Sequence, residues 1–225
     1  IEWYKNQFPN DNKMKGEACT NYTKYPANKG VPERIHQTVP DVRLIYILRD
    51  PIERLLSQVH HSILKGNEDE EDYQLKLYNP GCHYINCSRY YMQLEQYFPY
   101  FSKDQMLILT AEELKNDTQS TLQKIFRFLD LNQPDFYSPE YEKKKHTSSG
   151  RRKIKPAILR KALRKTPYYN YVAGNLWYLI PSKEIPKPEL HRNLYKHLKD
   201  IFRNDVKKLK TFTGRSFEEW KHTYD

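Results

Sequence analysis

A short apolar run that ends in Arg-Asp-Pro constrains this chain more than any other feature. Residues 43–48 read RLIYIL, a nearly continuous apolar run that is typical of a buried parallel strand. Asp50 can cap a following helix, and Pro51 suits the first helical position. Apolar side chains then recur at four-residue spacing over residues 55–63, which gives that helix a core stripe. The stretch therefore predicts a buried strand that turns directly into a helix.

Strand and helix signals alternate along the rest of the chain. A short helix is expected at 31–39, and an acidic loop at 66–73. An amphipathic helix is expected at 88–101, followed by a second apolar strand and the start of a helix at 105–114. Further helices are expected at 117–129 and, as a last amphipathic helix, after residue 190. This order indicates an α/β fold, in which helices flank a parallel sheet. We expect a single domain over residues 1–225, whose residues 156–225 form a C-terminal helical part.

The charge balance favours an anionic partner. Lys and Arg number 38 against 28 Asp and Glu, a formal net charge of +10. Nucleic acid, a phosphate-bearing cofactor, an acidic glycan and a membrane surface are all compatible with this excess. Much of it falls in residues 143–155, KKKHTSSGRRKIK, which alone would read as a solvated charged loop.

Cysteine usage and hydropathy narrow the class of protein. No apolar run approaches the roughly 20 residues of a membrane-spanning helix. The three cysteines have no zinc-site spacing, and their odd number leaves at least one thiol unpaired. A reducing compartment, and hence a cytoplasmic protein, is the expectation.

Arg49 and Ser57 are the strongest candidates for a binding site. Arg49 ends the predicted strand, and the carboxyl ends of strands form the ligand-binding edge of an open α/β sheet. Its planar fork suits bidentate recognition of a phosphate, and Ser57 lies about two turns into the next helix. Together they could hold one phosphate group. Alternatively, Arg49 pairs with a nearby carboxylate and Ser57 has no special role.

The stretch LRDPIERLLSQ at 48–58 resembles the 3′-phosphate-binding motif R-[DN]-P-x-x-R-x-x-S of the sulfotransferases. These enzymes use 3′-phosphoadenosine 5′-phosphosulfate (PAPS) as the sulfuryl donor. Further segments are similar to bacterial and heparan-type members in the same order: GEACTNYTKYP at 16–26, residues 90–131, HTSSGRRK at 146–153, and LKTFTGRSFEEW at 209–220. The resemblance covers nearly the whole chain, although residues 151–188 match weakly.

The resemblance implies roles for the binding residues. Arg49 and Ser57 would bind the 3′-phosphate of the donor. A basic loop over the nucleotide would add main-chain and guanidinium contacts from Ser149, Gly150, Arg151 and Arg152. A glycine is physically reasonable there because the backbone must approach a phosphate closely.

The resemblance also places a catalytic carboxylate at Glu17. Sulfuryl transfer needs a base to take a proton from the attacking hydroxyl or amine; the alternative is that Glu17 forms an ion pair that holds its loop. Ala18 stands where heparan-type enzymes often have lysine, and Thr20 stands where proline is common, so any role of that lysine falls to another residue or is absent here. His61 shares a helix face with Ser57 and is a second candidate base, although a helix histidine is more often a packing or surface residue.

One family element is missing from the sequence. The P-loop-like turn that holds the 5′-phosphosulfate contains Lys and Ser/Thr beside glycine, and no K-x-G-[TS]-T stretch occurs here. We therefore expect a sulfotransferase domain of P-loop-like α/β fold that begins downstream of this turn. If the missing part carries a membrane anchor, the Golgi lumen replaces the cytoplasm as the expected location.

The expected activity is PAPS-dependent sulfuryl transfer to a hydroxyl or amine, without a metal. The expected acceptor is a small molecule or a carbohydrate, with no nucleic-acid partner. Two alternatives remain open: a non-enzymatic basic module that binds nucleic acid or acidic glycan, and another nucleotide-binding transferase.

Overall fold

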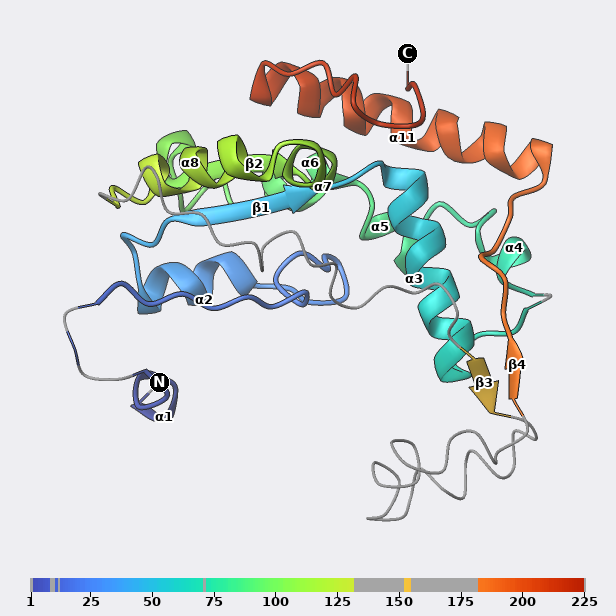
Figure 1. Ribbon diagram of the computed structural model, residues 1–225, viewed down its shortest axis with the longest axis horizontal. Helices are drawn as coiled ribbons and strands as arrows, with labels where there is room; N and C mark the ends of the chain where they lie inside the picture. Colours follow the sequence, from blue (N-terminus) through green and yellow to red (C-terminus); the bar gives the residue numbers. More distant parts are fainter. Residues whose placement is uncertain are drawn as a thin grey trace.

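The computed structural model describes residues 2–8, 11, 13–70, 72–131, 152–154 and 182–224, with the backbone alone for 5, 152–154 and 182–184 (Figure 1). In chain order the elements are α1 (Glu2–Lys5), α2 (Val31–Thr38), β1 (Leu44–Leu48), α3 (Pro51–Lys65), α4 (Tyr73–Lys76), α5 (His83–Asn86), α6 (Tyr90–Glu95), the 3-10 helix η1 (Lys103–Gln105), β2 (Met106–Thr110), α7 (Ala111–Asn116), α8 (Thr118–Phe128), β3 (Arg152–Ile154), β4 (Ser182–Glu184) and α11 (Arg192–Thr213).

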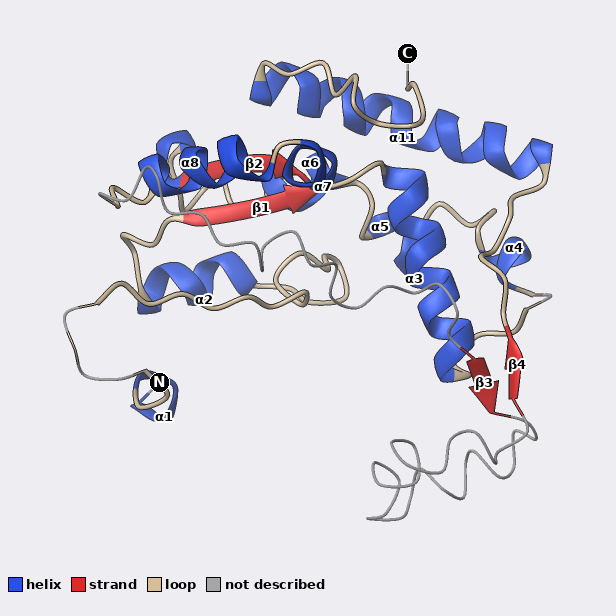
Figure 2. Cartoon of the chain, viewed as in Figure 1, coloured by secondary structure: helices blue, strands red, loops and turns tan. Residues whose placement is uncertain are grey.

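Strands β1 and β2 form the parallel pair that positions the site. Leu44 lies opposite Met106 and Leu48 lies opposite Thr110, so both strands end at the same edge. In Figure 2 the two strands run side by side, with α2 on one side and α6, α8 and α11 on the other. The predicted α/β fold, a parallel sheet flanked by helices in one domain, is confirmed.

Helix α3 begins and ends as the sequence predicts. The Asp50 side chain caps its N-terminus, Pro51 occupies the first turn, and Gly66 ends it with a left-handed φ of 72°. The predicted stripe of Leu55, Val59 and Ile63 is almost completely buried. Because the cap follows strand β1 immediately, residue 49 is placed at the sheet edge with no intervening loop.

Helix α11 closes the core over the sheet. Its fully buried residues are Leu194, Leu198, Phe202, Val206 and Leu209, and it packs against α6. One charged side chain is buried with them: Asp205 accepts hydrogen bonds from the backbone N–H groups of Tyr91 and Met92, at 3.0 Å each. Burial raises the pKa of Asp205, and the two N–H donors oppose that rise. A charged residue thus ties α11 to the first turn of α6.

Some segments differ from their sequence-based prediction. The predicted helix at 88–101 is helical only from Tyr90 to Glu95 and continues as turns. In the predicted acidic loop, Glu68 is buried and accepts hydrogen bonds from Lys76 and from the Tyr84 hydroxyl. The antiparallel pair β3–β4 was not predicted, because strands of three residues carry no readable periodicity.

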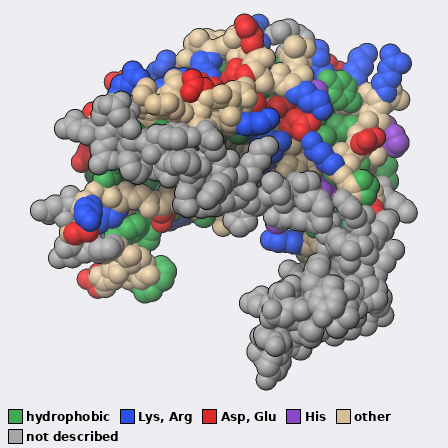
Figure 3. All heavy atoms as spheres, in the orientation of Figure 1, with side chains coloured by type: hydrophobic (Ala, Val, Ile, Leu, Met, Phe, Trp, Pro, Cys, Tyr) green, Lys and Arg blue, Asp and Glu red, His purple; other side chains and the backbone are tan. Residues whose placement is uncertain are grey.

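Three features of the described residues concern the kind of protein that this is: the surface charge, the cysteines and the character of the helices. On the face drawn in Figure 3, the described Lys and Arg side chains are interspersed with Asp and Glu and form no continuous basic patch. All three cysteines are free thiols. Within the described ranges, no helix has the length and apolar character needed to cross a membrane.

Candidate functional site at the carboxyl end of strand β1

Arg49 follows strand β1 at the edge of the sheet, where its backbone N–H and its carbonyl oxygen are both hydrogen-bonded. The Tyr90 hydroxyl donates a hydrogen bond to the Arg49 carbonyl oxygen at 2.8 Å and accepts one from the Arg49 N–H at 3.4 Å. Tyr90 is almost fully buried, and burial strongly raises its pKa, so the phenol stays neutral. The side chain of Arg49 is 38% exposed. The fold therefore fixes the backbone of Arg49 and leaves its charged end accessible.

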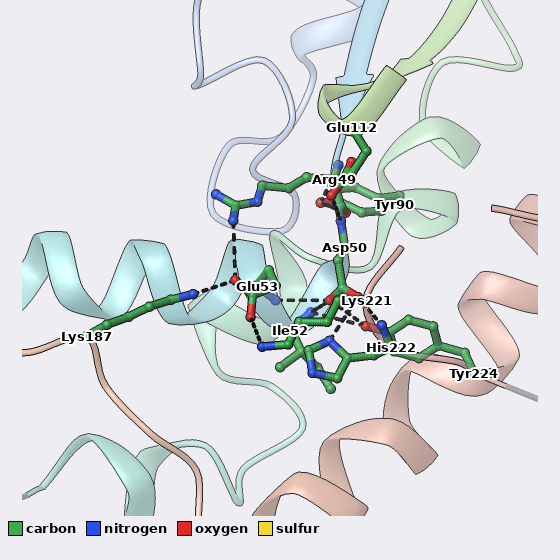
Figure 4. A network of polar contacts seen from close by, with 10 residues as sticks. All are labelled: Arg49, Asp50, Ile52, Glu53, Tyr90, Glu112, Lys187, Lys221, His222 and Tyr224. Carbon is green, nitrogen blue, oxygen red and sulfur yellow. Dashed lines mark hydrogen bonds and ion pairs between the residues drawn. The ribbon is translucent and has the colours of Figure 1, made fainter. Parts of the chain in front are cut away.

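Asp50 is fully buried beneath this arginine and organises the start of α3. Its Oδ1 accepts hydrogen bonds from the backbone N–H groups of Ile52 at 2.9 Å and Glu53 at 3.1 Å. The C-terminal tail adds three more donors: the His222 N–H at 2.8 Å, His222 Nδ1 at 2.9 Å and the Tyr224 hydroxyl at 2.9 Å (Figure 4). Burial favours the protonated acid, but the His222 contacts and the helix N–H groups outweigh it and lower the pKa of Asp50.

Glu53 gathers positive charge one turn into α3. Lys187 forms an ion pair with its Oε2, and Lys221 Nζ lies 3.2 Å from its Oε1. Arg49 Nη2 lies 3.7 Å from Oε2, which is a longer contact. Partial burial raises the pKa of Glu53, but the hydrogen bonds and charges of Lys187 and Lys221 bring it below its ordinary value. The alternative interpretation, in which Arg49 pairs with a nearby carboxylate, therefore holds in part, because Arg49 makes a long contact with Glu53.

Ser57 lies on the same helix, two turns beyond Asp50. Its side chain is half-buried, and no other described residue gives its hydroxyl a hydrogen bond. His61 is exposed one turn further along the same face. His60, by contrast, is buried, and its Nε2 lies 2.9 Å from the Ile185 carbonyl oxygen. His60 is therefore a packing residue, whereas Ser57 keeps its hydrogen-bonding capacity available.

The other predicted site residues lie apart from this group or outside the description. Glu17 is exposed, and it contacts Tyr4: burial raises the pKa of Tyr4, and a hydrogen bond to Glu17 adds to the rise. No hydrogen bond or ion pair joins Glu17 to Arg49 or Ser57. Ser149, Gly150 and Arg151 fall outside the described residues. The backbone of Arg152 begins β3, and its side chain is not described.

The end of strand β2 contributes two carboxylates beside the site. Glu112 accepts a hydrogen bond from the Asp50 N–H at 3.2 Å, and its second oxygen is buried without a partner among the described residues. Glu113 completes the capping box of α7, where its Oε2 accepts a hydrogen bond from the Thr110 N–H at 3.0 Å, and it pairs with Arg215 at 2.8 Å. The two strand ends are thereby linked to each other and to the C-terminal tail.

The Glu113 contacts predict an acid-sensitive contribution to stability. Partial burial raises its pKa, but hydrogen bonds from Lys124, Arg215 and Thr110 dominate and lower it from 4.5 to about 2. A lowered folded-state pKa stabilises the fold above about pH 4.5, and the contribution is lost as the pH falls toward 2. Glu113→Gln should therefore unfold more easily than wild type in urea at pH 7, and the gap should narrow at pH 3. The exposed Glu218→Gln is the control; a gap independent of pH would contradict the argument.

Several residues of this site were not predicted from the sequence. Glu53 was readable, because it lies four residues after Arg49 on a helix. Lys187, His222 and Tyr224 carry no local signal, since they reach the site only through the folding of distant segments. No group of three or more His, Cys, Asp or Glu side chains arranged to hold a metal occurs among the described residues.

Comparison with known proteins assigns the family. The sulfotransferase domain family model matches residues 30–210. The chain therefore belongs to the sulfotransferase family. A solved sulfotransferase from Alicyclobacillus acidocaldarius shares the fold, with a TM-score of 0.56 and 18% identity over 89% of this chain and 65% of that chain.

Three curated relatives have names that include heparan sulfate or carbohydrate sulfotransferase. The bifunctional heparan sulfate N-deacetylase/N-sulfotransferase 1 of Caenorhabditis elegans is 25% identical over 96% of this chain and 24% of its own length. The heparan sulfate glucosamine 3-O-sulfotransferase 3B1 of Mus musculus is 25% identical over 96% of this chain and 53% of its own. Mouse carbohydrate sulfotransferase 15 is 30% identical over 43% of this chain and 22% of its own. The chain thus spans about a quarter to about half the length of the relatives that it matches over most of its residues.

Proposed function

We propose that this protein transfers a sulfuryl group from PAPS to a hydroxyl or amine of a carbohydrate. The observation that carries the proposal is the placement of Arg49 at the carboxyl end of β1, with Ser57 two turns into the helix that follows, in a chain of the sulfotransferase family. Arg49 has a partly exposed side chain, and its ionic contact with Glu53 is long, at 3.7 Å. Ser57 has a hydroxyl without a partner in the described part of the chain. Both features fit a bound phosphate, which accepts hydrogen bonds from each.

PAPS supplies the activated sulfuryl group when it is bound. Arg49 and Ser57 would hold its 3′-phosphate, and the loop Ser149–Arg152 would cover it. The Tyr90 hydroxyl holds the Arg49 backbone at the strand end, so the side chain starts from a fixed position at the edge of the sheet. Glu17 or His61 would accept the proton from the acceptor. Removal of that proton makes the attacking oxygen or nitrogen more nucleophilic.

A transfer assay tests the proposal directly. The full-length protein is incubated with sulfur-labelled PAPS and a panel of acceptors, in which heparan-type and chondroitin-type polysaccharides stand beside simple phenols. Incorporation of label into a polysaccharide supports the proposal, and incorporation into phenols alone contradicts the carbohydrate assignment. Salt-steep binding to DNA or RNA without any transfer would favour the basic-module alternative. In the same assay, Glu17→Gln and His61→Gln identify the base, because its loss lowers kcat by about 100-fold or more.

Ser57→Ala should weaken the binding of adenosine 3′,5′-bisphosphate about tenfold. Hydrogen bonds to charged groups contribute about 1.5 to 3 kcal/mol, and about 1.4 kcal/mol corresponds to a factor of ten. Stability should change by less than about 0.5 kcal/mol, because the hydroxyl has no partner that the structure describes. Calorimetry gives the affinity, and Ser120→Ala on α8 is the matched control. Equal affinity of wild type and Ser57→Ala would exclude the serine from the phosphate site.

A further inference from the structure

Three cations from separate parts of the chain converge on Glu53. Lys187 precedes α11 and contacts Oε2, Lys221 belongs to the C-terminal tail and contacts Oε1 at 3.2 Å, and Arg49 follows β1. Figure 4 shows the two lysines reaching the carboxylate from different directions, with Arg49 on a third side. Each carboxylate oxygen therefore already has a lysine, and the contact with Arg49, at 3.7 Å, is the longest of the three.

We propose that Lys187 and Lys221 are positioning residues that neutralise Glu53 and so leave Arg49 free to bind the 3′-phosphate of the donor. This inference rests on the proposed function. An unneutralised carboxylate beside Arg49 would act in two ways. It would compete for the guanidinium, and it would repel a phosphate bound there, because like charges at this separation disfavour each other.

The geometry favours neutralisation over direct binding of phosphate by the lysines. Both ammonium groups are already engaged with Glu53, and each approaches a different carboxylate oxygen. The lowered pKa of Glu53 agrees with this arrangement. Partial burial by itself would raise that pKa, and the two lysines are the groups that reverse the effect. Glu53 is thus held as a carboxylate whose charge is compensated from two sides.

The two lysines belong to segments that lie far from Glu53 along the chain. Lys187 lies three residues after the end of β4, and Lys221 is next to His222, which holds Asp50. The segment before α11 contacts Glu53, and the C-terminal tail contacts both Glu53 and Asp50, so both segments support the start of α3. Neither lysine needs to move when the nucleotide binds.

A thermodynamic cycle tests this role. Calorimetry with adenosine 3′,5′-bisphosphate is carried out on wild type, on Lys187→Ala/Lys221→Ala, on Glu53→Gln, and on the triple variant. The double lysine variant should bind about tenfold more weakly than wild type. In the Glu53→Gln background, the same two lysine changes should alter the affinity by less than about twofold, because there is no carboxylate charge left to neutralise. Affinity for adenosine 5′-monophosphate, which lacks the 3′-phosphate, should be unchanged throughout.

Controls separate this role from general effects. Lys115→Ala/Lys207→Ala removes two exposed positive charges on α7 and α11 and should leave the affinity unchanged. A lysine effect of equal size in both Glu53 backgrounds, or one no larger than in this control, overturns the inference and leaves the proposed function intact. If wild type itself does not bind the bisphosphate, the proposed function and the inference both fail.

Discussion

Replacing Asp50 with alanine should lower the free energy of unfolding by about 3 to 5 kcal/mol, because it removes a helix cap and leaves buried hydrogen-bond donors unpaired. The substitution removes the cap of α3, which alone is typically worth about 1 to 2 kcal/mol. It also leaves the donors of His222 and Tyr224 without their acceptor, and Tyr224 is only 4% exposed. Each buried donor left unpaired costs about 1 to 3 kcal/mol. Urea unfolding at pH 7, followed by circular dichroism, measures the loss.

Asp117→Ala is the matched control, because Asp117 also caps a helix. It is exposed and accepts one N–H bond, from Ser120 at 3.0 Å, so its loss should cost only about 1 kcal/mol. If Asp50→Ala prevents folding altogether, Tyr224→Phe provides a milder measurement, with an expected loss of about 1 to 2 kcal/mol. Equal losses for Asp50→Ala and Asp117→Ala would show that the contacts with the C-terminal tail contribute nothing.

Arg49→Ala should reduce the affinity for adenosine 3′,5′-bisphosphate by about 30-fold or more. Loss of one partner from a hydrogen-bonded charge pair costs about 2 to 5 kcal/mol in binding, and each 1.4 kcal/mol is about tenfold. Stability should change little, since the Arg49 side chain is 38% exposed and its ionic contact is long. Calorimetry on the folded variant measures the affinity, and circular dichroism verifies the fold.

Two further variants make the Arg49 result specific. Arg127→Ala removes an exposed arginine of α8 and should bind the nucleotide as wild type does. Arg49→Lys keeps the charge but loses the planar fork, so it should recover only part of the affinity. Full binding by Arg49→Ala would remove this residue from the phosphate site.

The sequence was most informative where the structure is local. The apolar run, the Asp50 cap and the Pro51 start follow from neighbouring residues, and the structure places strand β1 and helix α3 accordingly. The parallel pairing of β1 with β2 also followed, because two apolar strands separated by helices indicate a crossover connection. The position of Arg49 at the sheet edge is a consequence of these two steps.

The rest of the site depends on contacts between distant segments, which no local pattern records. His222 and Tyr224 bond to Asp50 from 172 and 174 positions away along the chain, and Lys187 reaches Glu53 from 134 positions away. Asp205 looked like one of several polar residues on an amphipathic helix, yet it is buried and caps α6. Each of these contacts depends on how α11 and the C-terminal tail pack against the sheet. The hydrophobic periodicity of these segments does not specify that packing.

The comparison of two nucleotides tests the central claim most directly. Calorimetry on the full-length protein should show that adenosine 3′,5′-bisphosphate binds at least about 30-fold more tightly than adenosine 5′-monophosphate, which differs only by the 3′-phosphate. Arg49→Ala should remove most of that preference. Equal affinity of the wild-type protein for the two nucleotides would contradict the assignment of Arg49 and Ser57 as a 3′-phosphate site.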